Sequence, residues 1–167
     1  AVRAESGDAL WSALPGAVLG VRTADCVPLL IADPRTRSVA AVHSGWRSTE
    51  LGIATAAVDA LVLAGARAGD LIVAVGPHIA PASFEVGDDV AQRLAGLAPG
   101  CAVRLPREPR PHVDLVAVIS HQLAGCGVDT HRIDHIGGCT FAEPNRFFSH
   151  RRDGSPGGRM LSVIMAG

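Results

Sequence analysis

The segment Thr23-Ala-Asp-Cys-Val-Pro-Leu-Leu-Ile-Ala-Asp33, followed by Val42-His-Ser-Gly-Trp-Arg47, decides the fold of this chain. An apolar strand begins at Cys26, and the next apolar run ends at His43. The polar segment 33–37 between them has the composition of a turn, so the two strands are expected to pair antiparallel. In such a hairpin Cys26 and His43 lie side by side at one end.

A thiol beside an imidazole has two chemical interpretations. The pair is either a nucleophile with its base or two-thirds of a metal site. A lone cysteine or histidine in an apolar setting is often only a packed or hydrogen-bonded core residue, but two of them on one hairpin favour function. Asp25 precedes Cys26, and a carboxylate at the end of an apolar strand is costly without partners. We predict Cys26, His43 and Asp25, together with Arg47 of the following motif, as catalytic residues.

The composition indicates one globular domain over 1–167, with 48% hydrophobic and 19% charged residues. The net charge of -1 gives no basic footprint for nucleic acid, and no apolar run is long enough to span a membrane. All basic residues are arginine, which excludes chemistry that needs a lysine amine, such as Schiff-base formation. The four cysteines lack CxxC spacing, so we expect a cytoplasmic protein without a disulfide framework.

Strand and helix patterns alternate along the rest of the chain. They favour an α/β (mixed α+β) fold, in which mixed sheets are packed with helices. The expected strands are 17–21, 26–32, 38–42, 71–75, 135–139 and 160–165; the expected helices are 46–66, 88–97 and 113–126; loops are expected at 104–111 and 153–158. Three histidines in loop or helix contexts are interpreted as solvated surface residues, namely His112, His121 and His131.

Several polar residues near strand and helix ends are candidates for binding a ligand. Arg47 lies in the first turn of a predicted helix, where it opposes the helix dipole, so it binds an anion or forms a surface ion pair with Glu50. The loop after strand 71–75 carries two further ionisable side chains, and a second polar cluster lies near the C-terminus. These remaining candidates for substrate binding are His78, Glu85, Cys139, Thr140, Arg151 and Arg152.

A set of motifs recurs in order: Thr23-Ala-Asp-Cys26, Val42-His-Ser-Gly-Trp-Arg47, Gly76-Pro-His-Ile-Ala-Pro81, Phe84-Glu-Val-Gly87, Asp114-Leu115, Gln122-Leu123, Cys139-Thr140 and Phe148-Ser-His-Arg-Arg-Asp-Gly154. In this combination the chain resembles the laccase-domain family, also called the YfiH or polyphenol oxidoreductase family, now viewed as purine nucleoside phosphorylases. The resemblance implies a YfiH-like fold that is similar to toxin deamidases with a Cys-His pair.

The resemblance also implies a reaction and a cofactor. It implies zinc bound by one cysteine and two histidines, of which Cys26 and His43 match two. It further implies phosphorolysis of adenosine, inosine and methylthioadenosine, with adenosine deamination as a side activity. The implied partners are a purine nucleoside and phosphate, which Arg47 and the Arg151-Arg152 pair would hold, in a monomer or homodimer. The third ligand belongs to a Gln-x-His-Gly motif upstream of the segment at Asp8, so we expect either that an N-terminal segment is missing or that this is a shortened member with an incomplete site.

Three other functions compete with the zinc phosphorylase. A copper-dependent polyphenol oxidase would use copper at the same pair, although a multicopper enzyme needs His-x-His motifs and no two histidines here have that spacing. A cysteine hydrolase would use Cys26 as nucleophile and His43 as base. A degenerate, non-catalytic member of the family is the fourth alternative.

Overall fold

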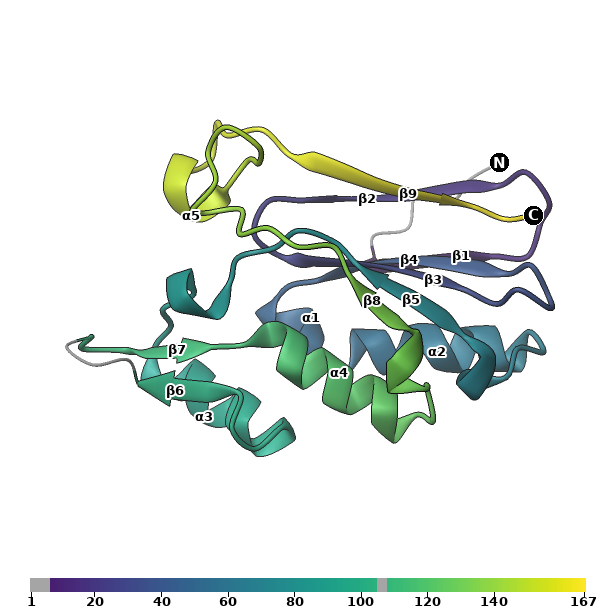
Figure 1. Cartoon of the computed structure of the whole chain (residues 1–167), viewed down its shortest axis with the longest axis horizontal. Helices are drawn as coiled ribbons and strands as arrows, with labels where there is room; N and C mark the ends of the chain where they lie inside the picture. The colour runs from purple at the N-terminus through teal and green to yellow at the C-terminus, as the bar shows by residue number, and fades with distance from the viewer. Residues whose placement is uncertain (1–6, 105–107) are drawn as a thin grey trace.

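The computed structural model describes residues 7–104 and 108–167, whose strands form two stacked sheets and a small hairpin (Figure 1). The strands are β1 (Ala9–Ser12), β2 (Val18–Thr23), β3 (Val27–Ala32), β4 (Val39–Ser44), β5 (Ile72–Val75), β6 (Ala102–Arg104), β7 (Pro111–Val113), β8 (Ile133–His135) and β9 (Met160–Met165). The α-helices are α1 (Trp46–Glu50), α2 (Ile53–Leu63), α3 (Asp88–Leu97), α4 (Leu115–Gly125) and α5 (His150–Asp153). Short 3-10 helices are η1 (Ala68–Asp70), η2 (Pro81–Ser83) and η3 (Thr130–Arg132).

The predicted hairpin forms the centre of a five-stranded sheet with the order β1-β4-β3-β5-β8. β3 and β4 pair antiparallel, with Pro28 opposite His43. β5 continues the sheet antiparallel to β3, and β8 is parallel to β5. The sheet is therefore mixed, as expected from the sequence, because a short turn joins β3 and β4 while a long connection carrying helices α3 and α4 separates β5 from β8.

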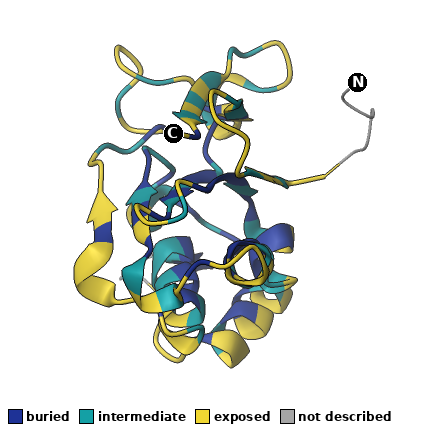
Figure 2. Cartoon of the chain, turned by 90° about the vertical axis from the view of Figure 1, so that its right-hand side faces the viewer, coloured by how far each residue is buried: buried dark blue, intermediate teal, exposed yellow. Residues whose placement is uncertain are grey.

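Helices α1, α2 and α4 cover one face of this sheet, and the parts of the sheet and helices that face each other are coloured as buried (Figure 2). The predicted helix 46–66 is wrong in one respect, because it is divided into α1 and α2 at Gly52, whose φ of 75° is left-handed. α4 begins at Asp114, whose side chain accepts a hydrogen bond from the Ala117 amide at 3.0 Å. None of the helices in the described ranges combines the length and apolar character needed to cross a bilayer.

The other face of the five-stranded sheet is covered by a two-stranded sheet of β2 and β9 (Figure 1). Alternate residues of β9 turn inward, while Leu161, Val163 and Met165 remain exposed. The predicted strand 160–165 is confirmed, and the first predicted strand, 17–21, lies one to two residues early relative to β2. This second layer brings the chain after α5 back over the end of the hairpin that carries Cys26.

Two expectations near the C-terminal half need correction. The strand predicted at 135–139 is wrong, because β8 ends at His135 and the following loop contains Gly138 at a φ of 133°. The loop predicted at 104–111 begins at the last residue of β6 and ends at the first residue of β7, while residues 105–107 lie outside the described part of the chain. The short elements β1, β6, β7 and α5 carry too few residues for a readable period, and the sequence did not predict them.

Candidate functional site

Cys26 and His43 meet at the end of the central hairpin, as predicted. Cys26 directly precedes β3, and His43 lies in β4. A hydrogen bond to Cys26 is the largest influence on His43; with Asp8 it outweighs burial and raises the pKa of His43 to about 9. Gly45 keeps this contact open, because a Cβ there would lie 3.1 Å from Cys26 Sγ and 3.8 Å from His43 Cε1. The glycine in the Gly-Trp-Arg motif therefore serves the pair directly.

Asp8, the residue that precedes the neighbouring strand β1, supports His43. Nδ1 of His43 donates to Oδ1 of Asp8 at 3.0 Å, and the His43 amide donates to the Asp8 carbonyl at 2.7 Å. The bond at Nδ1 leaves Nε2 as the nitrogen that can bind a metal. Metal-ligating histidines usually donate their other ring N–H to a partner such as a carboxylate. Sequence reasoning missed Asp8, since only the pairing of β1 with β4 brings it to His43.

The chemistry of this pair fits a transition metal. A thiolate and an imidazole together suit zinc or copper(I), and the Asp8 carboxylate supplies the outer-shell bond. Among the described residues, no third His, Cys, Asp or Glu completes a three-ligand group with Cys26 and His43. Because its pKa is about 9, His43 without a metal carries a proton on both ring nitrogens at neutral pH. Metal binding at Nε2 therefore has to release the proton on that nitrogen.

A cleft of about 300 Å³ opens beside His43 and is lined by Asp8, Arg22 and His43. Arg22 is exposed on β2 and brings a guanidinium to the same opening. Sequence reasoning did not select Arg22, because an isolated arginine on a short strand carries no recognisable signal. The cleft gives a small molecule access to the histidine side of the pair.

Asp25 positions the loops around Cys26. Its φ of 85° is unusual for a residue with a side chain, and the residue is buried. Its carboxylate accepts a bond from Thr140 Oγ1 at 2.6 Å and another from the Arg151 amide at 2.6 Å. Its carbonyl accepts the Ile79 amide at 3.0 Å. Both side-chain oxygens are thus engaged in fixing the C-terminal loops, and its predicted catalytic role stays a prediction.

Arg152 is committed to the backbone of the same loops. Its five N–H groups bond Asp153 and the carbonyls of Thr140, Phe141 and Phe147, at distances of 2.8–3.0 Å. A guanidinium has no more than five donors. We therefore assign Arg152 to loop architecture and leave it out of any anion site.

Arg47 and Arg151 are exposed and lie over aromatic rings. The Arg47 guanidinium is 4.5 Å from the centroid of Trp46, and that of Arg151 is 5.5 Å from Phe84. The alternative ion pair of Arg47 with Glu50 does not form among the described residues, because Glu50 pairs with Arg93 at 3.3 Å. A second cleft of about 440 Å³ is lined by both aromatic rings and by Glu85, Arg110 and Arg151.

His78 and Cys139 are brought together by a single parallel bridge between their backbones. Nδ1 of His78 donates to the Gly76 carbonyl at 2.9 Å, and Cys139 Sγ accepts the Ala80 amide at 3.3 Å. Burial raises the pKa of the Cys139 thiol, but hydrogen bonds from Ala80 and neighbouring groups outweigh burial and lower it. These contacts stabilise the loop junction beside Asp25.

Of the three histidines interpreted as solvated, His121 and His131 are exposed. The interpretation of His112 is wrong, because this residue is only 5% exposed. His112 lies in β7, which packs against η2 and α3. Three residues are too few to show a strand pattern, so the sequence does not predict this burial.

The chain is similar to known proteins both in sequence and in fold. The sequence matches the family described as multi-copper polyphenol oxidoreductase laccase over residues 1–167. It is 41% identical to a purine nucleoside phosphorylase of Deinococcus radiodurans, over 95% of this chain and 60% of that protein. It is 37% identical to adenosine deaminase RL5 of an unknown prokaryotic organism, over 96% of this chain and 62% of that protein.

The fold has solved counterparts. The crystal structure of the hypothetical protein YfiH of Bacillus licheniformis superposes with a TM-score of 0.88 at 31% identity, covering 96% of this chain and 61% of that one. YlmD of Geobacillus stearothermophilus gives a TM-score of 0.87 at 33% identity, over 95% and 60% of the two chains. The chain thus spans about three fifths of the relatives it matches. It belongs to the multi-copper polyphenol oxidoreductase laccase family, the family of YfiH-like proteins.

Proposed function

We propose that this chain carries the metal-binding core of a zinc-dependent purine nucleoside phosphorylase. The observation that carries the proposal is the contact of Cys26 with His43, supported by Asp8 and open to a cleft. The names of relatives at 41%, 36% and 38% identity, all purine nucleoside phosphorylases, support the reaction. Because the chain spans only part of these relatives, both the reaction and the substrates are proposals for this protein.

Cys26 and His43 would hold the zinc, with Asp8 keeping His43 oriented through Nδ1. Bound zinc supplies a Lewis acid for a substrate oxygen or a bound water of lowered pKa. Gly45 keeps the space between the two ligands free of a side chain. The remaining ligand positions would be taken by a third protein ligand and by substrate or water.

In phosphorolysis a phosphate oxygen bonds to C1′ of the ribose while the bond from C1′ to the purine nitrogen breaks. The products are ribose 1-phosphate and the free base, which takes up a proton. Arg47 and Arg151 are the proposed phosphate ligands, since both guanidinium groups are exposed on segments adjoining Cys26. Guanidinium suits this task because it binds phosphate oxygens in pairs.

The direct test is release of hypoxanthine from inosine by the zinc-loaded protein, measured with and without phosphate. We expect phosphate-dependent release that is abolished in C26S and retained in D59N, a charge change at an exposed position of α2. Absence of phosphate-dependent release in the zinc-loaded wild type overturns the proposal.

A second activity is favoured by the relative named adenosine deaminase RL5. We propose that the same site removes ammonia from adenosine: water adds to C6 of the purine, the bond from C6 to the amino nitrogen breaks, and ammonia leaves with a proton from the water. Formation of inosine from adenosine in phosphate-free buffer tests this activity. Copper loading with a phenol and oxygen uptake tests the polyphenol oxidase, and activity that survives a chelator would instead identify the cysteine hydrolase.

A further inference from the structure

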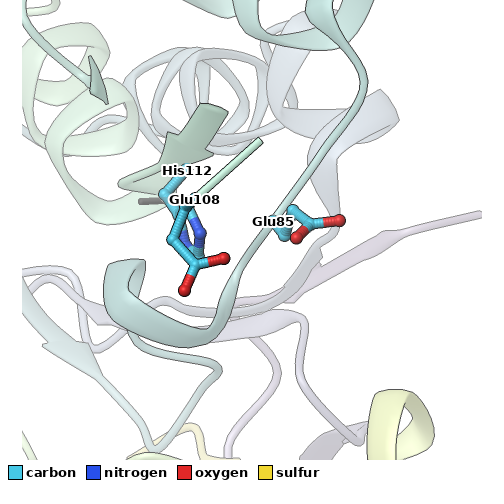
Figure 3. Close-up of side chains that lie close together, drawn as sticks. All are labelled: Glu85, Glu108 and His112. Atoms are coloured by element: carbon cyan, nitrogen blue, oxygen red, sulfur yellow. The ribbon is translucent and has the colours of Figure 1, made fainter. Parts of the chain in front are cut away.

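We propose that Glu85, Glu108 and His112 form a second binding site, for a divalent cation of the manganese(II) type. Their ligand atoms all lie within 4.8 Å of one another, and the three side chains gather beside β7 (Figure 3). The site contains neither Cys26 nor His43, and it stands whether or not the proposed reaction is correct.

The backbone holds two of these residues in register. Glu85 and His112 form an isolated antiparallel bridge. The flanking bonds run from the Val86 amide to the Pro111 carbonyl at 3.0 Å, and from the Val113 amide to the Phe84 carbonyl at 3.2 Å. This is the pattern of a non-hydrogen-bonded pair, whose two side chains lie on the same face and close together. The register therefore preorganises a carboxylate beside an imidazole.

His112 points independently to a missing ligand. It is 5% exposed, and its Nδ1 donates to the Pro81 carbonyl at 2.9 Å. With Nδ1 protonated by that bond, Nε2 carries the free lone pair, yet this buried atom has no hydrogen-bond partner among the described residues. Buried polar atoms in folded proteins rarely lack a hydrogen-bond partner. Metal-ligating histidines typically donate one ring N–H to a carbonyl or carboxylate and bind the metal through the other nitrogen, and His112 has this arrangement.

The charges around the site favour a cation. Glu85 and Glu108 bring two carboxylates to one histidine, and Arg110 lies 3.6 Å from Glu85 Oε1. Arg110 is exposed and makes a long contact, so a bound cation can replace it beside Glu85. Two carboxylate oxygens and one imidazole, without a thiolate, suit manganese(II), whereas the Cys26–His43 pair suits softer ions.

The position of the site connects it to the second cleft. Glu85 and Arg110 line that cleft together with Arg151. A cation held by Glu85 would face the cleft and add positive charge on the side where Arg151 already lies. The ligand class expected beside it is an anion that can bridge a metal and a guanidinium, such as a phosphate group.

The experiment is a titration of the metal-free protein with manganese(II) alone, followed by electron paramagnetic resonance of the free ion. We expect one site in the wild type, and an apparent Kd raised at least about tenfold in both E85Q and E108Q. Glu108 is exposed, so E108Q tests the site without disturbing the core. D89N, which removes a nearby exposed charge at the start of α3, is the matched control and should leave the Kd unchanged.

Two further measurements make the test specific. Electron spin echo modulation should detect a nitrogen-14 coupling to the bound manganese that is lost in H112Q and retained in H43Q. C26S should bind manganese as the wild type does. The proposal is overturned if the wild type binds no manganese, if E85Q and E108Q bind it unchanged, or if C26S abolishes binding. None of these readouts depends on nucleoside turnover, so failure of the proposed function leaves them unaffected.

Discussion

Asp8, the residue before β1, lies beside His43 of β4, and its Oδ1 accepts a hydrogen bond from His43 Nδ1 at 3.0 Å. The same two residues are joined through their backbones, because the His43 amide donates to the Asp8 carbonyl at 2.7 Å. Two bonds between one pair of residues fix the position of the imidazole and direct its Nδ1–H at Asp8. Nε2 is thereby reserved for Cys26 or for a metal.

Replacing Asp8 with asparagine should weaken metal binding without unfolding the protein. The amide cannot stabilise a ligated imidazole as the carboxylate does, and losses of about 10- to 100-fold in affinity are typical for such partners. Competition with a chromophoric zinc chelator measures the change in D8N, with D59N as the control. An unchanged zinc affinity in D8N would show that Asp8 does not serve a metal ligand.

Replacing Gly45 with alanine should damage the site sterically. The new Cβ would lie 3.1 Å from Cys26 Sγ, so the sulfur has to move by a few tenths of an ångström. The backbone at Gly45, with φ −81° and ψ 173°, accepts alanine, so any loss is due to the contact and not to strain. We expect weaker zinc binding in G45A, measured by the same competition assay.

Gly96 offers a matched control for this substitution. It lies within α3, and a Cβ there meets no atom within 4 Å. G96A should therefore raise the free energy of unfolding by about 0.5–1 kcal/mol and leave zinc affinity unchanged. Equal zinc affinity in G45A and G96A would contradict the steric role of Gly45.

Replacing Asp25 with asparagine should loosen the loops around Cys26. The carboxylate accepts hydrogen bonds from Thr140 Oγ1 and the Arg151 amide, each at 2.6 Å. Asparagine keeps one acceptor oxygen, but its NH₂ group cannot accept the other bond and places a donor against a donor. Asparagine tolerates the left-handed φ of 85°, so the backbone can stay in place. We expect the free energy of unfolding in urea to fall by about 2 kcal/mol. The free energy of unfolding of T140V should fall by less than that of D25N, because T140V removes one bond without placing a donor against a donor.

Acid should destabilise the β3–β4 turn through Asp33. Burial raises the pKa of this carboxyl, but hydrogen bonds from Thr36 and from the Arg35 and Thr36 amides, with the charge of Arg35, outweigh burial and hold it below 3.8. A carboxyl whose pKa is lower in the folded state contributes stability above its ordinary pKa. That contribution is lost as the pH falls through the folded value.

The wild type should therefore lose stability below about pH 4 more steeply than D33N. Urea denaturation of both proteins at pH values between neutral and strongly acidic measures the difference. Parallel pH profiles for the two proteins would contradict this role of Asp33.

The sequence by itself determined the central hairpin, the strand 160–165, the helix 88–97 and the meeting of Cys26 with His43. These features depend on residues that are close in the sequence. One turn joins β3 to β4, and the spacing of apolar residues within each element predicts which face is buried. The sequence also marked Asp25 and Arg47 as residues that need a partner, because one is a carboxylate at the end of an apolar strand and the other an arginine that opposes a helix dipole.

Only the tertiary structure decided the partners of these residues. Asp8 reaches His43 through the pairing of β1 with β4, and the Arg151 amide reaches Asp25 from far along the chain. Arg152 resembles Arg151 in sequence, yet its donors are all used within the protein. His112 had the composition of a surface loop but is buried, and its register with Glu85 follows from a bridge between distant segments. Apolar periodicity specifies burial along one element, whereas contacts between polar groups depend on how distant strands pair, which no local pattern encodes.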